Sequence, residues 1–161
     1  MAQLEDKIAL ITGAGRGIGQ AIALAYAREG AKLSLAARSV PELEETANQC
    51  RKLGAEVLIT PTDVADPGQV TRLVDATVER YSTIDILVNN AVNSVAAPFL
   101  ELSDEDWLNH INVKVMGYVR CSREVVPHME RRGGGRIINI GGMAARNAGN
   151  LTNSNGVTNS A

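Results

Sequence analysis

A glycine-rich segment near the N-terminus has the residue types and spacing of a phosphate-binding loop. The segment Thr12–Gly19 follows the apolar run Lys7–Ile11 and leads into a stretch with helical periodicity. Glycines let the backbone turn tightly, and the first turn of the following helix presents unpaired N–H groups and a partial positive charge. We therefore expect a dinucleotide ligand, held through its pyrophosphate. The expected contacts in the loop are Gly13, Gly15, Arg16, Gly17, Ile18 and Gly19.

The charge of the residue that follows the second expected strand bears on whether the dinucleotide is NAD(H) or NADP(H). In dinucleotide-binding folds, an acidic residue after the second strand hydrogen-bonds the ribose 2′-hydroxyl of NAD. Here Arg38 occupies this position, and with Arg16 it would flank a 2′-phosphate, for which the guanidinium fork is well suited. We therefore expect NADP(H) in preference to NAD(H). The alternative is that Arg38 is a solvated charge at a strand end and that Arg16 is merely exposed.

Short β-rich runs alternate with helical patterns along the chain. This alternation predicts an α/β fold, a Rossmann-like doubly wound parallel sheet with helices on its faces. Because βαβ connections are right-handed, we expect strand order 3-2-1-4-5 and ligand contacts at the carboxyl ends of the strands. The expected strands are Lys7–Thr12, Lys32–Ala37, Glu56–Thr60, Ile84–Asn89 and Arg136–Ile140.

The longest expected helix begins near Ser103. Its apolar residues recur at helical spacing until Pro127 kinks the helix or brings it near its end. Two histidines of this helix, His110 and His128, have polar neighbours in the sequence, so we expect both at the surface. The segment Trp107–Val119 is a candidate interface if the chain folds as part of a homo-oligomer.

The composition is that of a single soluble globular domain spanning residues 1–161. Of 161 residues, 45% are apolar and 21% are charged, and the formal net charge is -2. The sequence has no long basic run for nucleic acid, no membrane-spanning segment and no signal peptide, so we expect a cytoplasmic protein. Cys50 and Cys121 lack metal-ligand spacing and are expected to be buried, reduced thiols.

Five short motifs, in order along the chain, resemble the short-chain dehydrogenase/reductase family. They are the glycine loop, Asp63–Val64 after the third strand, Asn89–Ala91 after the fourth, Asn112 in the long helix and Gly135–Ile140 at the fifth strand. The resemblance implies a Rossmann-type NAD(P)-binding domain. It also implies that Asp63 and Val64 contact the adenine and that Asn112 is an active-site asparagine. Asn90, Ala91 and Val113 complete the expected cofactor contacts.

The same resemblance assigns the chemistry to positions that here hold other residues. Family members use a serine after the fifth strand, then a tyrosine and a lysine four residues apart in the next helix. In this register the three positions hold Gly142, Asn155 and Asn159. Another register cannot supply the missing groups, because Tyr118 is the last tyrosine and Lys114 the last lysine of the chain.

The missing tyrosine bears directly on the expected activity. An asparagine amide has no usable proton, and general acid catalysis is commonly worth about 10²–10⁴ in rate. Asn112, Ser154 and Asn155 still offer neutral hydrogen bonds to an oxyanion. We expect an NADP(H)-binding oxidoreductase with impaired or atypical hydride transfer to a small carbonyl or from an alcohol. The alternative is a non-catalytic NADP(H)-binding sensor or assembly module.

The chain ends where the next helix of the family begins. The resemblance implies that a helix, two more strands and most of the substrate pocket lie beyond this point. We therefore expect an incomplete, C-terminally shortened domain whose fifth strand has an exposed edge. A fragment of a longer protein and a truncated product are both compatible with this ending. Val92 stands where the family usually has glycine, and its branched side chain would crowd the nicotinamide.

Overall fold

A five-stranded parallel sheet forms the centre of the computed structural model, which describes residues 2–146 and 153–161. The strand order is β3-β2-β1-β4-β5, so the predicted topology is confirmed. Every neighbouring pair is parallel. The predicted strands match the observed ones apart from one or two residues at their ends. The strands are β1 (Ile8–Thr12), β2 (Lys32–Ala37), β3 (Val57–Pro61), β4 (Ile86–Asn89) and β5 (Arg136–Asn139).

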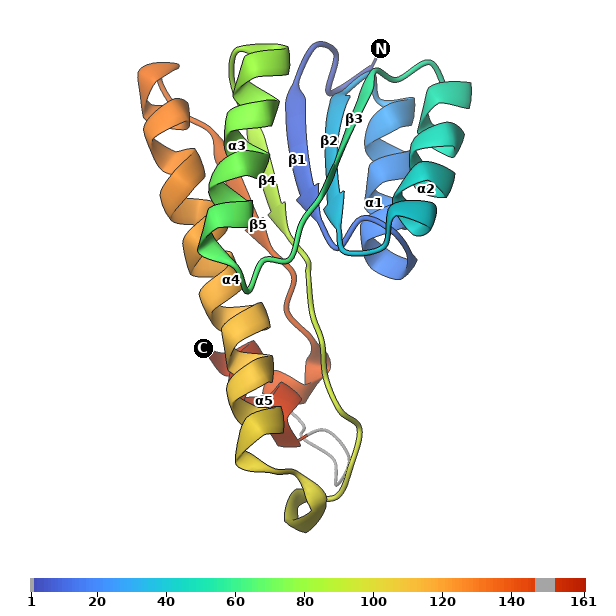
Figure 1. The fold of residues 1–161 in the computed structure, drawn as a ribbon. Coiled ribbons are helices and arrows are strands. Elements are labelled where there is room, and N and C mark those ends of the chain that lie inside the picture. Colours follow the sequence, from blue (N-terminus) through green and yellow to red (C-terminus); the bar gives the residue numbers. More distant parts are fainter. Residues whose placement is uncertain (1, 147–152) are drawn as a thin grey trace.

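Helices cover both faces of the sheet, with α1 and α2 on one face and α3 and α4 on the other (Figure 1). Successive side chains of β1 point to opposite faces, so Ile11 packs with the α1–α2 layer and Leu10 with the α3–α4 layer. Each layer therefore has its own apolar core. The helices are α1 (Gly17–Arg28), α2 (Val40–Lys52), α3 (Pro67–Tyr81), α4 (Asp104–Arg131) and α5 (Asn153–Ser160).

The sequence marks the starts of α3 and α4 with capping residues. Asp66 is the N-cap residue of α3, and its carboxylate accepts a hydrogen bond from Gln69 N at 3.1 Å. The next residue, Pro67, occupies the first helical position. Ser103 forms a reciprocal capping box with Asp106 at the start of α4. Pro127 lies inside α4, close to its end at Arg131, as the sequence predicts.

The second half of the chain is less enclosed than the first. All four residues of β5 are exposed, and this strand forms an edge of the sheet. The first half of α4 extends beyond the carboxyl ends of the strands, where α5 lies beside it (Figure 1). Cys50 and Cys121 are buried free thiols, as predicted. Within the described residues, no helix has the length and apolarity needed to cross a membrane.

Candidate functional site

A cavity of about 620 Å³ lies at the carboxyl ends of β1, β2, β3 and β4, where the sequence predicts the ligand. Most of the expected cofactor contacts line it, including both arginines. Gly19 does not line the cavity and packs beneath the loop instead. The lining residues are Gly13, Gly15, Arg16, Gly17, Ile18, Ala37, Arg38, Ser39, Glu42, Thr62, Asp63, Val64, Asn90, Ala91, Val92 and Val113.

Hydrogen bonds between Thr12 and Asn90 hold the glycine loop against the end of β4. The Thr12 hydroxyl accepts from the backbone N–H groups of Asn90 and Ala91, at 3.0 and 3.2 Å, and donates to Val88 O at 3.3 Å. In return, the Asn90 amide nitrogen donates to Thr12 O and Gly13 O, each at 3.1 Å. Two strand ends distant in sequence are therefore joined at the floor of the cavity.

Two glycines are required by this close packing. A Cβ atom on Gly13 would lie 2.9 Å from Asn90 Nδ2, and the φ of Gly13 is 63°, which side chains rarely adopt. A Cβ atom on Gly19 would lie 2.6 Å from the same nitrogen and would also clash with Gly13 O. At these two positions the loop therefore has no room for a side chain.

The N-terminus of α1 faces the cavity without a protein cap. Arg16 is the N-cap residue, but its side chain makes no capping hydrogen bond, and the first turn contains no acidic residue. Gly17 and Ile18, the first helical residues, line the cavity. The first N–H groups of α1 and the positive end of its dipole thus suit the pyrophosphate of a dinucleotide.

The rim of the cavity carries both signs of charge. Arg16 and Arg38 lie there, as predicted, but so does Glu42 from the first turn of α2. Arg16 Nε is 3.9 Å from Glu42 Oε1, and the Arg16 side chain is 85% exposed, so the pair is weak and solvated. A phosphate would meet two guanidinium groups and one competing carboxylate at this rim.

The loop after β3 is braced by its own side chains. Asp63 N donates to Gln69 Oε1, and Ala65 N donates to Asp63 Oδ1, both at 2.9 Å. These bonds fold the loop into the start of α3 and place Asp63 and Val64 at the cavity wall. The arrangement provides a carboxylate and an apolar side chain, which suit the polar edge and the face of a heterocycle.

The four predicted catalytic positions do not line this cavity. Asn112 lies on α4, and its side-chain oxygen accepts from Arg120 Nη2 at 2.6 Å. Gly142 is exposed before a short 3-10 turn, and Asn155 is half-buried on α5. Asn159 also lies on α5 and packs near Gly142. A Cβ atom added to Gly142 would lie 3.0 Å from Asn159 Nδ2. Within the part of the chain that the structure describes, the buried Asn159 Oδ1 atom has no hydrogen-bond partner.

The last lysine and the last tyrosine of the chain meet the end of β5. Lys114 Nζ and Tyr118 OH both donate to Ile140 O, at 2.8 and 3.0 Å, and Lys114 also donates to Tyr118 at 3.3 Å. Burial lowers the pKa of Lys114 and raises the pKa of Tyr118 to about 12. Both side chains, with Asn159, line a second cavity of about 600 Å³. The sequence places these residues on the helix but does not show this convergence.

The prediction that His110 lies at the surface is wrong. Its side chain is only 2% exposed, because α5 packs against it. His110 Nδ1 lies 2.9 Å from Ser154 Oγ, and Nε2 lies 3.3 Å from Thr158 Oγ1. The Thr158 hydroxyl donates to Ser154 O at 3.0 Å, so its oxygen accepts from His110 Nε2–H, and Ser154 donates to Nδ1. A neutral imidazole that carries its proton on Nε2 satisfies both contacts, and burial, which lowers the pKa of His110, favours this neutral form. His128, by contrast, is partly exposed.

Several cavity residues were not predicted as cofactor contacts. Ala37, Ser39 and Glu42 flank Arg38 in the chain, and Thr62 precedes Asp63. Their closeness in the sequence to the predicted contacts Arg38 and Asp63 could have indicated that they line the cavity. Val92 does reach the cavity, where its side chain is 52% exposed.

Comparisons with known proteins agree with this geometry. The family model for short chain dehydrogenase matches residues 7–154. An uncharacterized oxidoreductase of Thermotoga maritima is 41% identical over 137 residues, covering 85% of this chain and 54% of the relative. The chain thus spans about half the length of this curated relative.

Two solved structures share the fold closely. The L-sorbose reductase of Gluconobacter frateurii, in complex with NADPH and L-sorbose, has a TM-score of 0.93 and 38% identity, covering 99% of this chain and 61% of that one. An NAD⁺-bound xylitol dehydrogenase has a TM-score of 0.94 and 30% identity, covering 98% and 61%. Relatives of this fold therefore include complexes with either dinucleotide.

The neutral state of His110 makes stability depend on pH. Burial, reinforced by the positive charge of Lys114, lowers the pKa of His110 below its ordinary value of 6.5. The folded protein therefore binds fewer protons here than the unfolded chain, so this stability is complete above pH 6.5 and is lost as the pH falls below it. We expect the unfolding free energy, measured by urea titration, to fall between about pH 7 and about pH 5, and His110→Gln to flatten this slope. His128→Gln, which retains His110, is the control, and an unchanged slope in His110→Gln would contradict the assignment.

Proposed function

The chain belongs to the short-chain dehydrogenase family, and on this premise we propose that it binds NADP(H) with impaired or altered hydride transfer. Its substrate would be a small carbonyl compound or alcohol. The observation that supports the cofactor most strongly is the pair Arg16 and Arg38 at the rim of a cavity that also holds an uncapped helix N-terminus. Guanidinium groups suit a 2′-phosphate, and the helix start suits a pyrophosphate.

Each end of the dinucleotide has residues suited to it in this proposal. Gly15 to Ile18 would hold the pyrophosphate through backbone N–H groups, and Asp63 with Val64 would hold the adenine. Asn90, Ala91, Val92 and Val113 would surround the nicotinamide end. When bound, the cofactor supplies or accepts a hydride. Thr12 and Asn90 keep the glycine loop in shape before the ligand arrives, so little ordering is needed on binding.

The proton step is the weak point of the proposed chemistry. A carbonyl that gains a hydride needs a proton on its oxygen, and Asn155 at the tyrosine position offers only an amide N–H. Gly142 provides no hydroxyl, and Asn159 provides no cation. Asn112 retains an amide donor, because its side-chain oxygen is held by Arg120. Neutral donors of this kind stabilise an oxyanion without protonating it.

A non-catalytic NADP(H)-binding module is the second candidate. It is favoured by the separation of the two halves of the site: the predicted cofactor residues converge on one cavity, whereas Asn112, Gly142, Asn155 and Asn159 do not line it. Loss of chemistry with retention of binding would produce this pattern.

We also propose that the chain forms a homo-oligomer through α4. Its outer side exposes Leu108, Met116, Val119 and Val126, by 67%, 37%, 39% and 36%. Burial of such a stripe against a second copy is favourable at roughly 25 cal/mol per Å² of apolar surface.

We expect sedimentation equilibrium to give a mass above that of one chain, and Leu108→Glu to lower this mass. A wild-type monomer at all concentrations would contradict this surface.

The cofactor preference tests the arginine pair. We expect Arg38→Asp to weaken NADPH binding at least about tenfold, since a charge-assisted hydrogen bond is worth about 1.5–3 kcal/mol, and to affect NADH far less. Glu42→Gln removes the competing carboxylate while keeping the shape, so NADPH affinity should rise. Isothermal titration calorimetry gives both affinities. Arg123→Asp, an exposed charge reversal on α4, is the control, and an unchanged NADPH to NADH ratio in Arg38→Asp would refute the proposed phosphate site.

Turnover separates the two candidates. NADPH consumption over a panel of ketones and aldehydes is compared for the wild type and the variant Gly142→Ser/Asn155→Tyr/Asn159→Lys, with binding measured in parallel. Restoring a proton donor should raise turnover by about 10²-fold or more. Wild-type turnover above background would exclude the non-catalytic module. Binding without turnover would exclude the enzyme, and absence of binding would contradict both.

A further inference from the structure

Arg120 on α4 connects the loop after β3, which lines the nucleotide cavity at Val64, with the turn of α4 that carries Asn112. Its guanidinium is partly buried and makes three hydrogen bonds. Nη1 donates to Val64 O at 3.2 Å and to Asn112 O at 3.0 Å, and Nη2 donates to Asn112 Oδ1 at 2.6 Å. One planar fork thus holds the loop after β3 and an earlier turn of α4.

The side chain of Val64 is fixed from the same helix. A Cβ atom on Gly117 would lie 2.8 Å from Val64 Cγ2, so α4 approaches the loop directly at this glycine. Val64 is only 5% exposed, yet it lines the cavity. The loop is therefore held by α4 at two points, through the valine side chain and through its carbonyl oxygen.

The other anchors of the loop come from its own neighbourhood. Gln69 and Asp63 brace it toward α3, as described above. In the described part of the chain, Arg120 is the one side chain of α4 that donates to this loop. Its removal would release the loop from α4 and leave only the bonds on the α3 side, which would then open more often.

Asn112 is held in one orientation by the same fork. Both of its oxygen atoms accept from Arg120, so the side-chain nitrogen is directed away from the guanidinium. An amide held in this way presents a donor, rather than an acceptor, to anything beside it.

We infer that Arg120 is a positioning residue for nucleotide binding: its guanidinium holds the Val64 loop, the adenine side of the cavity, in register with the turn of α4 that carries Asn112. The inference rests on the proposed nucleotide function of the cavity. It assigns Arg120 no contact with the ligand, because Arg120 acts through Val64 and Asn112.

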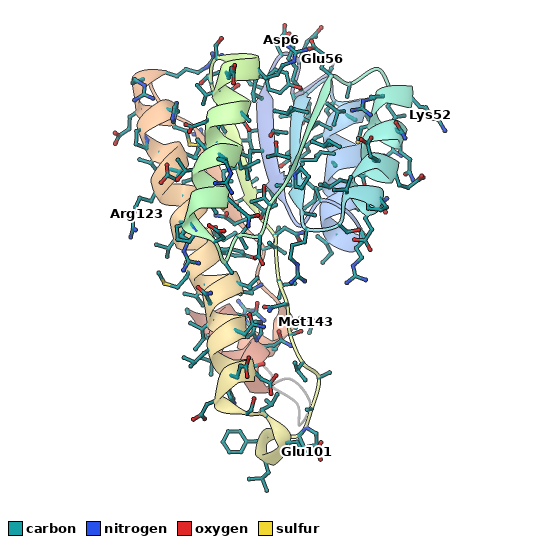
Figure 2. All side chains as sticks on the ribbon, viewed as in Figure 1. Asp6, Lys52, Glu56, Glu101, Arg123 and Met143 are labelled. Carbon is teal, nitrogen blue, oxygen red and sulfur yellow. The ribbon has the colours of Figure 1, made fainter. Side chains whose placement is uncertain are left out.

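Binding of ADP-ribose, which carries the adenine and pyrophosphate without the nicotinamide, tests this role. Titration calorimetry well below the melting temperature compares the wild type with Arg120→Met, Arg120→Lys and Arg123→Met. Loss of one hydrogen bond that orders the loop should weaken ADP-ribose about tenfold in Arg120→Met. Arg120→Lys, which retains a donor, should recover part of the affinity. Arg123→Met removes an exposed charge from the same helix and should bind as the wild type does; Figure 2 shows Arg123 pointing away from the rest of the protein.

Hydrogen exchange distinguishes positioning from simple destabilisation. The backbone N–H groups of Asp63 and Ala65 should exchange faster in Arg120→Met, while those of β1 remain protected. If Arg120→Met does not fold, Arg120→Gln, which is too short to reach both acceptors, is the deciding variant. The inference would be overturned if the folded Arg120 variant bound ADP-ribose with the same affinity as the wild type and showed the same exchange rates. Absence of wild-type binding to both ADP-ribose and NADPH would instead overturn the proposed function of the cavity.

Discussion

The hydrogen bonds between Thr12 and Asn90 are the constraint on which the site depends. They join the ends of β1 and β4 through both side chains and bring Asn90 against the start and the end of the glycine loop. The Thr12 hydroxyl both donates and accepts, and the Asn90 side-chain amide donates twice, so the two side chains satisfy five backbone groups at a place where the strands end and ladder bonds stop. Gly13 and Gly19 follow from this geometry, because any side chain on them would meet Asn90.

Helix α4 connects the nucleotide cavity with the end of β5 through two sets of side chains. Val113, Gly117 and Arg120 face the Val64 loop, whereas His110, Lys114 and Tyr118 face α5 and Ile140. Each set follows the spacing of three or four residues that places side chains on one helical face. The same helix therefore borders both regions, and of these residues only Val113 lines the nucleotide cavity.

Sequence patterns predicted the parts of the molecule that depend on local spacing. Strand order follows from alternating elements and the handedness of their connections, and the glycine loop follows from its own residues. His110 shows where this reasoning fails: its chain neighbours are polar, but the residues that bury it, Ser154 and Thr158, come from a helix far along the chain. Arg120 was missed for the same reason, since its partner Val64 is brought to it by tertiary packing and leaves no signature in the local sequence.

Buried side-chain oxygens without a hydrogen-bond partner among the described residues occur in both halves of the site: Asn89 and Asn93 flank the cavity segment Asn90–Val92, and Asn159 lies near the end of β5. Around Thr12 and Asn90 the side-chain donors find acceptors, and the uncapped start of α1 faces an open cavity suited to an anion. At the end of β5, Asn159 Oδ1 is buried and has no hydrogen-bond partner among residues 2–146 and 153–161; an acceptor left unsatisfied in this way costs about 1–3 kcal/mol. A lysine at that position would have a donor rather than an acceptor there. Asn159 Oδ1 therefore lacks a donor among the described residues, at the position where the family resemblance expects a lysine, while the cavity at the other strand ends presents an uncapped helix start suited to an anion.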